Sequence, residues 1–228
     1  MEKNEKRIMK ITRTVLTAVA LTVLMTVMFA SSVAADPMFV DPADDMHTAN
    51  GFAVATPYLD ITSYQLSVST STGTPIYNAT FNMNGKIPAS ATGFVAWELL
   101  VDADYNAMTA PCGHYWLLDH QIGVDYVIRF YIRGNSFGAE AYTCDSNSGS
   151  QISMTPPTVK VQGNQVTLLF CESDIGMATV FAYVFATVQY SKYTYHVTSC
   201  DFVKADIAPN YGYESFGGYV VPAIRFSA

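Results

Sequence analysis

The chain has 228 residues, of which 50% are hydrophobic and only 14% are charged, and its formal net charge is -7. This length predicts one domain or two, and the aromatic content of 13% excludes an intrinsically disordered chain. The acidic balance excludes binding to a nucleic-acid backbone, which depends on clustered basic side chains.

The first 35 residues have the layout of a secretory signal peptide. Five basic side chains lie within residues 1–13, an apolar run covers residues 15–30, and small residues end the segment at Ala35. The run is shorter than the roughly 20 residues of a spanning helix. We expect cleavage after Ala35 and a secreted or cell-surface protein, with an uncleaved N-terminal anchor as the alternative. The remaining 193 residues hold 7 basic and 17 acidic side chains, a net charge of -10, and we expect no membrane span in them.

We expect the rest of the chain to form a single all-β domain. Residues 36–56 are acidic and contain Pro37, Pro42 and Gly51, which is typical of a flexible lead-in. Residues 57–212 are predicted to form the domain itself. Residues 213–228 form a C-terminal tail that is a candidate for an added edge strand.

Apolar side chains alternate with polar ones along much of this domain, which is the pattern of strands with one buried face. The alternation is clear at residues 64–69, 77–83 and 126–133, where Arg129 and Arg133 lie on the face opposite the apolar side chains. Residues 178–190 are apolar on both faces, which favours a central strand covered on both sides. About nine strands and no long helix predict an antiparallel β-sandwich of the immunoglobulin-like or jelly-roll-like type.

Two pairs of residues predict tight turns between strands. Gly163 and Asn164 separate two alternating runs, which is a strong hairpin signal. Asn84 and Gly85 predict a second turn, in which we expect the glycine to adopt a positive φ.

Cysteine usage predicts two disulfides. The four cysteines, all beyond the leader, are Cys112, Cys144, Cys171 and Cys200. An even number in an exported chain favours disulfides over free thiols. The expected strand order brings Cys144 to the end of the sandwich that carries the Cys112 loop, and it gives Cys171 and Cys200 a common end. We therefore expect the pairs Cys112–Cys144 and Cys171–Cys200.

An acidic loop after one strand is a candidate calcium site. Asp102, Asp104 and Asn106 place oxygen atoms at alternate positions, as the start of a calcium loop does. A full calcium loop is absent, so further ligands would come from Asp60 and Asp125, which both lie at strand starts. The alternative is a turn in which these side chains cap the backbone of their own loop. Calcium is the one metal or cofactor that we favour from the residues alone.

Three aromatic residues near that loop are a candidate ligand platform: Tyr105, Tyr115 and Trp116. Aromatic faces stack on the apolar faces of sugar rings, which suggests a glycan or cell-surface polymer as the partner. The alternative is that these rings pack in the core, as we expect for Trp97 in the middle of a strand. Asn78 begins an N-glycosylation acceptor sequence on the polar face of its strand.

We find no arrangement of residues that favours catalysis and expect a protein that is not an enzyme. Residues 134–138 match the G-x-S-x-G string of serine hydrolases, whose serine lies between a strand and a helix. Here the string joins two predicted strands, so we expect Ser136 in a hairpin. A secreted hydrolase is our third interpretation.

Seven short motifs follow one another along most of the domain. They lie at residues 58–63, 85–88, 97–109, 122–127, 166–169, 173–176 and 206–210. Their succession, from Pro57 to Gly212, resembles the exported β-sandwich domains of the DOMON superfamily and of the family 9 carbohydrate-binding modules. It departs from that pattern after Thr109, where a Cys- and His-bearing insert extends to Gln121.

The resemblance implies the same fold and a binding role. A sugar is the implied ligand, and a haem-binding electron-transfer domain is the alternative. Met83 and His196 are the haem-ligand candidates, although the alternation places Met83 in the core and His196 on a polar face.

Overall fold

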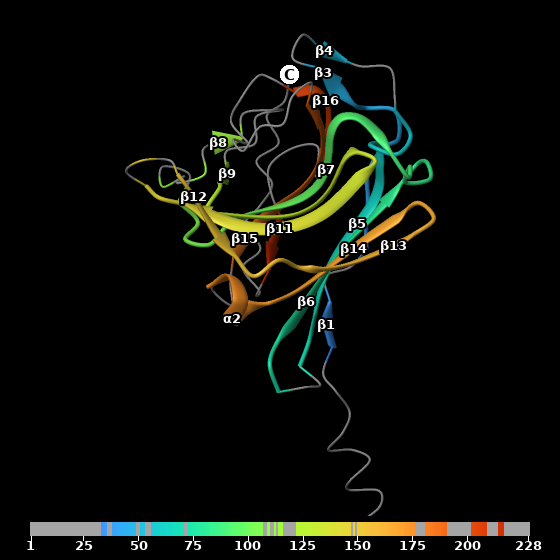
Figure 1. Cartoon of the computed structure of the whole chain (residues 1–228). Coiled ribbons are helices and arrows are strands. Elements are labelled where there is room, and N and C mark those ends of the chain that lie inside the picture. The colour runs from blue at the N-terminus through green and yellow to red at the C-terminus, as the bar shows by residue number, and fades with distance from the viewer. Residues whose placement is uncertain are drawn as a thin grey trace, which may run out of the picture.

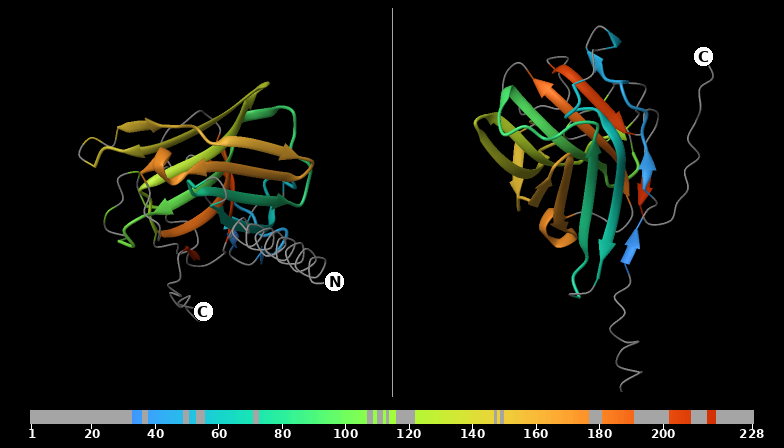
Figure 2. Two further views of the ribbon diagram at one scale, coloured as in Figure 1. Left: turned by 90° about the horizontal axis from the view of Figure 1, so that it is seen from below. Right: turned by 90° about the vertical axis from the view of Figure 1, so that its right-hand side faces the viewer.

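The computed structural model describes residues 33–35, 38–48, 51–52, 56–70, 73–106, 109, 112, 114–115, 122–146, 148, 150–176, 181–190, 202–208 and 214–216. Among these residues, two antiparallel sheets pack face to face (Figure 1, Figure 2), which confirms the predicted β-sandwich. The described part of the chain also contains a single helical turn, α2 (Glu172–Ile175). No described helix is long and apolar enough to span a membrane.

Sheet A is the smaller sheet, with the strand order β1-β5-β6-β14-β13 and with β2 also paired to β5. Its strands are β1 (Val33–Ala35), β2 (Phe39–Val40), β5 (Ile61–Ser69), β6 (Ile76–Met83), β13 (Thr158–Gln162) and β14 (Gln165–Cys171). Every second residue of β6 is buried, as the alternation predicts. The β13–β14 hairpin is confirmed, with Gly163 at a φ of 66°. β1 consists of the last residues of the predicted leader, so cleavage after Ala35 would remove it.

Sheet B has the strand order β12-β11-β10-β7-β15-β16-β3-β4, and β17 also pairs with β15. Its strands are β3 (His47–Thr48), β4 (Gly51–Phe52), β7 (Ala91–Asp102), β10 (Tyr126–Gly134), β11 (Ser136–Cys144), β12 (Gln151–Met154), β15 (Phe181–Tyr190), β16 (Phe202–Ala208) and β17 (Glu214–Phe216). A separate small sheet pairs β8 (His114–Tyr115) with β9 (Ile122–Gly123). The predicted lead-in thus contributes β2, β3 and β4, and the tail contributes β17.

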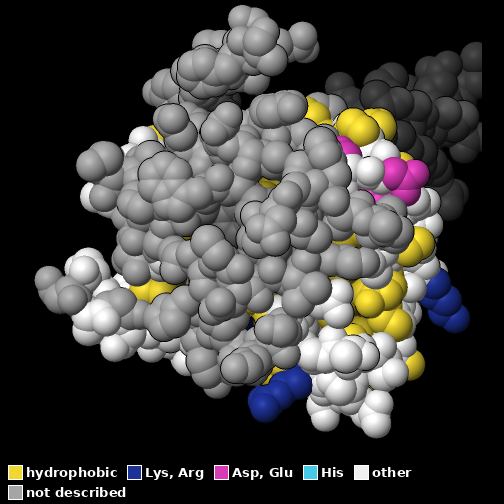
Figure 3. All heavy atoms as spheres, turned by 90° about the horizontal axis from the view of Figure 1, so that it is seen from above, with side chains coloured by type: hydrophobic (Ala, Val, Ile, Leu, Met, Phe, Trp, Pro, Cys, Tyr) yellow, Lys and Arg dark blue, Asp and Glu magenta, His cyan; other side chains and the backbone are white. Residues whose placement is uncertain are grey.

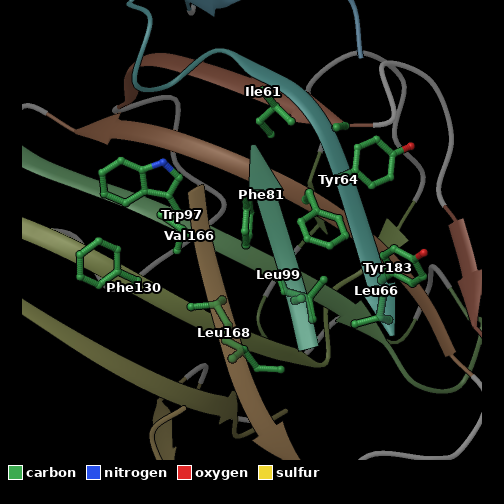
Figure 4. Close-up of a cluster of buried hydrophobic side chains, with 14 of the residues drawn as sticks. Ile61, Tyr64, Leu66, Phe81, Trp97, Leu99, Phe130, Val166, Leu168 and Tyr183 are labelled. Carbon is green, nitrogen blue, oxygen red and sulfur yellow. The ribbon is translucent and has the colours of Figure 1, made fainter. Parts of the chain in front are cut away.

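The core between the sheets is rich in aromatic side chains, which extend toward one another from both sheets (Figure 4). Phe81 of sheet A meets Phe185 of sheet B edge to face, with ring centroids 4.6 Å apart. Trp97 stacks on Phe130 at 5.3 Å and is fully buried, which confirms its predicted place in the core. Its indole N–H donates a hydrogen bond of 3.2 Å to the Tyr58 carbonyl oxygen. Aromatic pairs of this kind stabilise a core beyond the area that they bury.

The outer face of sheet B is buried as well. β15 lies between β7 and β16, and all its residues except Gln189 are buried, which confirms the predicted doubly covered strand. Arg129 of β10 faces away from the core, as predicted, yet it is only 1% exposed. Its guanidinium forms ion pairs with Glu98 and Glu140, and these carboxylates compensate for its burial.

The predicted turn after β6 forms, but our reason for its glycine is wrong. Gly85 is not among the residues with a positive φ. A Cβ atom at this position would lie 2.5 Å from the Pro57 Cβ and 3.0 Å from the Pro57 carbonyl carbon. The Gly85 N–H also donates a 2.7 Å hydrogen bond to the Pro57 carbonyl oxygen. Glycine is therefore needed here because two backbone segments approach closely.

Candidate functional site

Two groups of aspartates bring carboxylate oxygens within 4.8 Å of one another. The loop cluster consists of Asp102, Asp104 and Asp125, and the interior cluster consists of Asp41, Asp45 and Asp206. The sequence predicts the convergence of the loop cluster and misses the interior cluster.

Strand pairing builds the loop cluster. β7 ends at Asp102, and its antiparallel neighbour β10 begins at Tyr126, which pairs with Val101. Asp125 therefore lies beside the loop that leaves β7, and its N–H donates a 2.8 Å hydrogen bond to the Val101 carbonyl oxygen. The Asp125 Oδ2 atom in turn accepts a 2.8 Å hydrogen bond from the Ala103 N–H. Residues distant in sequence are thus fixed next to each other at one sheet end.

A disulfide fastens the chain beside this cluster. Cys112 is bonded to Cys144 at the end of β11, with Cα atoms 5.0 Å apart, which confirms one of the two predicted pairs. The Cys112 N–H also donates a 3.0 Å hydrogen bond to the Val124 carbonyl oxygen. Cys171 lies at the end of β14, and Cys200 is outside the described residues, so their pairing stays a prediction.

The loop cluster satisfies much of its own hydrogen bonding. The Asn106 N–H donates to Asp104 Oδ1 at 2.9 Å and approaches Asp102 Oδ1 at 3.3 Å. The Thr109 hydroxyl donates to Asp104 Oδ2 at 2.6 Å. These bonds describe the self-capped turn that the sequence offers as the alternative to calcium.

Burial and charge set the ionisation of the loop cluster. Burial, together with repulsion from Asp125, raises the pKa of Asp102 to about 6. Burial also raises the pKa of Asp125. Burial acts in the same direction on Asp104, but hydrogen bonds from Thr109 and Asn106 outweigh it and lower the pKa of Asp104. The cluster therefore holds one well-stabilised negative charge at the surface and two carboxylates that a cation would help to ionise.

The predicted aromatic platform is only partly described. Tyr105 has a φ of 56°, and its half-buried ring packs against an apolar cluster on the outer face of sheet B. Tyr115 lies in β8, of which the structure describes the backbone, and Trp116 lies outside the described residues.

The other residues singled out in the sequence are dispersed. Asn78 is half-buried in the middle of β6, and Ser136 is exposed at the start of β11, in the predicted hairpin. Met83 is 1% exposed in the core, as the alternation predicts, and His196 lies outside the described residues. Asp60 does not join the loop cluster: it is fully buried beside the interior cluster.

The interior cluster lies where the chain passes from sheet A to sheet B. Residues 41–46 connect β2, which pairs with β5, to β3, which pairs with β16. We call residues 41–46 the crossing segment. The Asp41 N–H donates a 3.0 Å hydrogen bond to the Thr62 carbonyl oxygen of β5. Asp206 of β16 accepts a 2.6 Å hydrogen bond at Oδ2 from the Ile61 N–H, which links the two sheets directly.

Asp60 holds this arrangement together from the start of β5. Its Oδ1 atom accepts a 3.0 Å hydrogen bond from the Asp44 N–H, where Asp44 has a φ of 68°. Its Oδ2 atom accepts a 2.8 Å hydrogen bond from the Asn84 side chain. Both carboxylate oxygens of Asp60 thus have partners, and the bond from the Asp44 N–H fixes the position of the crossing segment.

Burial dominates the ionisation of the interior cluster. Asp41 is 5% exposed and Asp206 is fully buried. Burial, followed by repulsion from Asp206, raises the pKa of Asp41 to about 9. Burial raises the pKa of Asp206 to about 8, against the lowering effect of the Ile61 hydrogen bond. The sequence of β16 gives no sign of this cluster, because Lys204 and Asp206 alternate with apolar residues as they would on the polar face of a strand.

An apolar cleft opens between the sheets at another place, and the sequence gives no sign of it. It has a volume of about 660 Å³ and lies between the β6–β7 connection, β10, β11 and β13. Its lining consists of Lys86, Ile87, Pro88, Ala89, Phe130, Ile132, Phe137, Val159 and Val161. Phe137 is 72% exposed and Val161 is 46% exposed, so large apolar side chains reach the surface at this cleft.

Comparison of the chain with protein-family models, with curated proteins and with solved structures finds no match. The residues and the geometry therefore carry the functional argument.

Proposed function

We propose that this protein is an exported, non-enzymatic β-sandwich binding module whose loop cluster binds calcium and whose adjoining surface binds carbohydrate. The observation that carries the proposal is the convergence of Asp102, Asp104 and Asp125 in a loop fastened by the Cys112–Cys144 disulfide. Carbohydrate is the leading ligand class because of the nearby aromatic residues and the resemblance to carbohydrate-binding modules.

Calcium suits this cluster chemically. Calcium takes 6–8 oxygen ligands, and carboxylates are its usual protein ligands. Three carboxylates whose oxygens lie within 4.8 Å of one another supply a partial set, which other oxygens and water would complete. A cation here would offset the repulsion between Asp102 and Asp125 and stiffen the loop before a ligand binds.

A glycan array on the purified protein, with calcium and again with a chelator, tests the proposal. We expect binding that Trp116→Ala abolishes and Asp104→Asn weakens through the loss of calcium. Phe137→Ala is the matched control, because Phe137 is an exposed aromatic residue that lines the apolar cleft instead. A folded protein that binds no glycan with or without calcium would rule out the carbohydrate role.

The apolar cleft favours a second candidate function, the binding of an apolar small molecule. Its volume of about 660 Å³ falls within the range of small-molecule pockets. Lys86 at the cleft would suit an anionic end of such a ligand. Haem belongs to this ligand class, although the described lining contains neither His nor Met.

Titration with haem and with an anionic fluorescent apolar dye separates these candidates. A Soret band that grows with added haem would favour the haem-binding electron-transfer alternative. Dye binding that Phe137→Ser weakens, without a Soret band, would favour a general apolar ligand. Absence of both signals would exclude the cleft as a ligand site.

A further inference from the structure

The interior cluster gathers carboxylates from parts of the chain that are far apart in sequence. Asp41 and Asp45 come from the crossing segment, and Asp206 comes from β16 of sheet B. Asp60, at the start of β5 in sheet A, adds a further negative charge that acts on Asp41 and Asp206. In the view of Figure 3, the acidic side chains of the described residues gather in one small group, and Lys and Arg side chains lie apart from it.

Asp41 carries an oxygen atom that has no described donor. Asp41 Oδ2 is buried, and no described group donates a hydrogen bond to it. Asp206 differs, because Oδ2 accepts from the Ile61 N–H and Oδ1 accepts from the Ile207 N–H. No described Lys or Arg forms an ion pair with either carboxylate. A buried carboxylate oxygen without a donor is costly, so this atom indicates a missing positive partner.

We propose that Asp41, Asp45 and Asp206 bind a hard divalent cation, calcium, between the two sheets and that this cation fastens the crossing segment to the sandwich. The described ligand atoms are all carboxylate oxygens, a set that suits calcium, magnesium or manganese rather than zinc or copper. Calcium fits best, since its flexible coordination accepts an irregular set that backbone oxygens and water complete.

Asp60 acts as a positioning residue in this site. Its two oxygens are engaged by the Asp44 N–H and the Asn84 side chain, so it shapes the crossing segment and does not need the cation. The cation would bind the crossing segment, which follows β2 of sheet A, and β16 of sheet B at the same time. This site is independent of the loop cluster and of the carbohydrate role proposed above.

Asp41→Asn is the sharpest variant for a test. Asparagine has the shape of aspartate, and the Asp41 Oδ2 atom accepts a hydrogen bond from no described group, so little else is lost. Chelator-treated wild type and variant are titrated with calcium by isothermal calorimetry, and their Tm is measured with calcium and with EDTA. Asp104→Asn in the loop cluster is the matched control.

We expect the wild type to bind calcium at the interior cluster and to gain Tm. Asp41→Asn should lose affinity at this site on the order of tenfold or more, because a charged ligand is removed. In EDTA the same variant should be as stable as the wild type or more stable, since a repelling carboxylate is gone. Asp104→Asn should keep the calcium binding that Asp41→Asn loses.

Two results would overturn the inference. One is a calcium titration that Asp41→Asn leaves unchanged in stoichiometry and affinity. The other is a wild type without any calcium response in Tm or calorimetry, which would mean that protonation of the carboxylates, and not a cation, relieves their repulsion. Calcium binding that Asp41→Asn weakens and Asp104→Asn leaves unchanged would support the interior site and count against calcium at the loop cluster.

Discussion

The interior and loop clusters each hold three aspartates with oxygens within 4.8 Å of one another, yet they are built differently. In the loop cluster, Asp104 is engaged by Thr109 and Asn106 a few residues along the chain. In the interior cluster, Asp41 and Asp206 meet only because the two sheets pack together, and one oxygen of Asp41 has no described donor. A carboxylate in a turn can be capped by groups a few residues away, as Asp104 is. The buried Asp41 oxygen, which packing has placed beside other carboxylates, needs a partner from outside the protein.

Removal of Asp206 should give the largest loss of stability. Asp206→Ala deprives the buried Ile61 and Ile207 N–H groups of their acceptors and cuts the link between β5 and β16. We expect a loss of about 4 kcal/mol in the free energy of unfolding, measured by urea denaturation in EDTA. Asp125→Ala is the matched variant: it removes the acceptor of the Ala103 N–H beside a partly exposed loop, and we expect a loss of about 1 kcal/mol. Equal losses for the two would show that the clusters do not differ in this way.

Loss of the disulfide should lower the stability of the whole domain, but it should lower calcium affinity only at the loop cluster. Cys112→Ser with Cys144→Ser should cost about 3 kcal/mol, because the unfolded chain regains its freedom. Calcium affinity at the loop cluster should fall with it, while affinity at the interior cluster stays. Calorimetry on the double variant measures both, and a fall at the interior cluster would contradict the separation of the two sites.

The two clusters should also differ in their pH dependence without calcium. An acid whose pKa is raised in the folded state is protonated there first, so stability falls as pH rises from the unfolded pKa to the folded one. Because the pKa values of Asp41 and Asp206 are raised to about 9 and about 8, Tm in EDTA should fall by several degrees between pH 4 and pH 9.

In the loop cluster, Asp102 should contribute to that fall only up to about pH 6, its raised pKa. Asp41→Asn should therefore flatten the profile up to pH 9, and Asp102→Asn should flatten only its acidic part. A Tm profile that rises between pH 6 and pH 9 in EDTA would disprove the assignment.

Thr109→Val should give the smallest effect. It removes the hydroxyl that donates to Asp104 Oδ2, in an exposed part of the loop. We expect a loss of about 0.5 kcal/mol or less and a small rise in the pKa of Asp104, which NMR titration measures. A loss as large as that of Asp125→Ala would mean that the turn depends on this one bond.

The sequence predicts features that follow from local pattern. The β13–β14 hairpin follows from Gly163, and the doubly buried β15 follows from its unbroken apolar run. Cys112–Cys144 and the loop cluster follow because strands that are neighbours in the chain bring their ends together. Each of these predictions needs only strand order and alternation.

Features that depend on how the sheets face each other escape such reasoning. Asp41 lies in what the sequence presents as an acidic lead-in, and nothing local says that it meets Asp206. Arg129 is polar and alternates as a surface residue would, yet the outer face of sheet B is covered. The turn needs Gly85 because Pro57 approaches closely, and not because of a positive φ.

The pairing of β1 with β5 has a kinetic consequence for the predicted cleavage after Ala35. Val33, Ala34 and Ala35 are in register with Ser69, Val68 and Ser67 of β5, so the predicted cleavage point becomes a paired strand once sheet A has formed. A peptidase needs the backbone at its cleavage point to be unpaired. Cleavage after Ala35 and the pairing of β1 with β5 therefore compete for the same backbone amides. Early cleavage would remove β1 before it pairs with β5, whereas early folding would pair these three residues first and protect them from the peptidase.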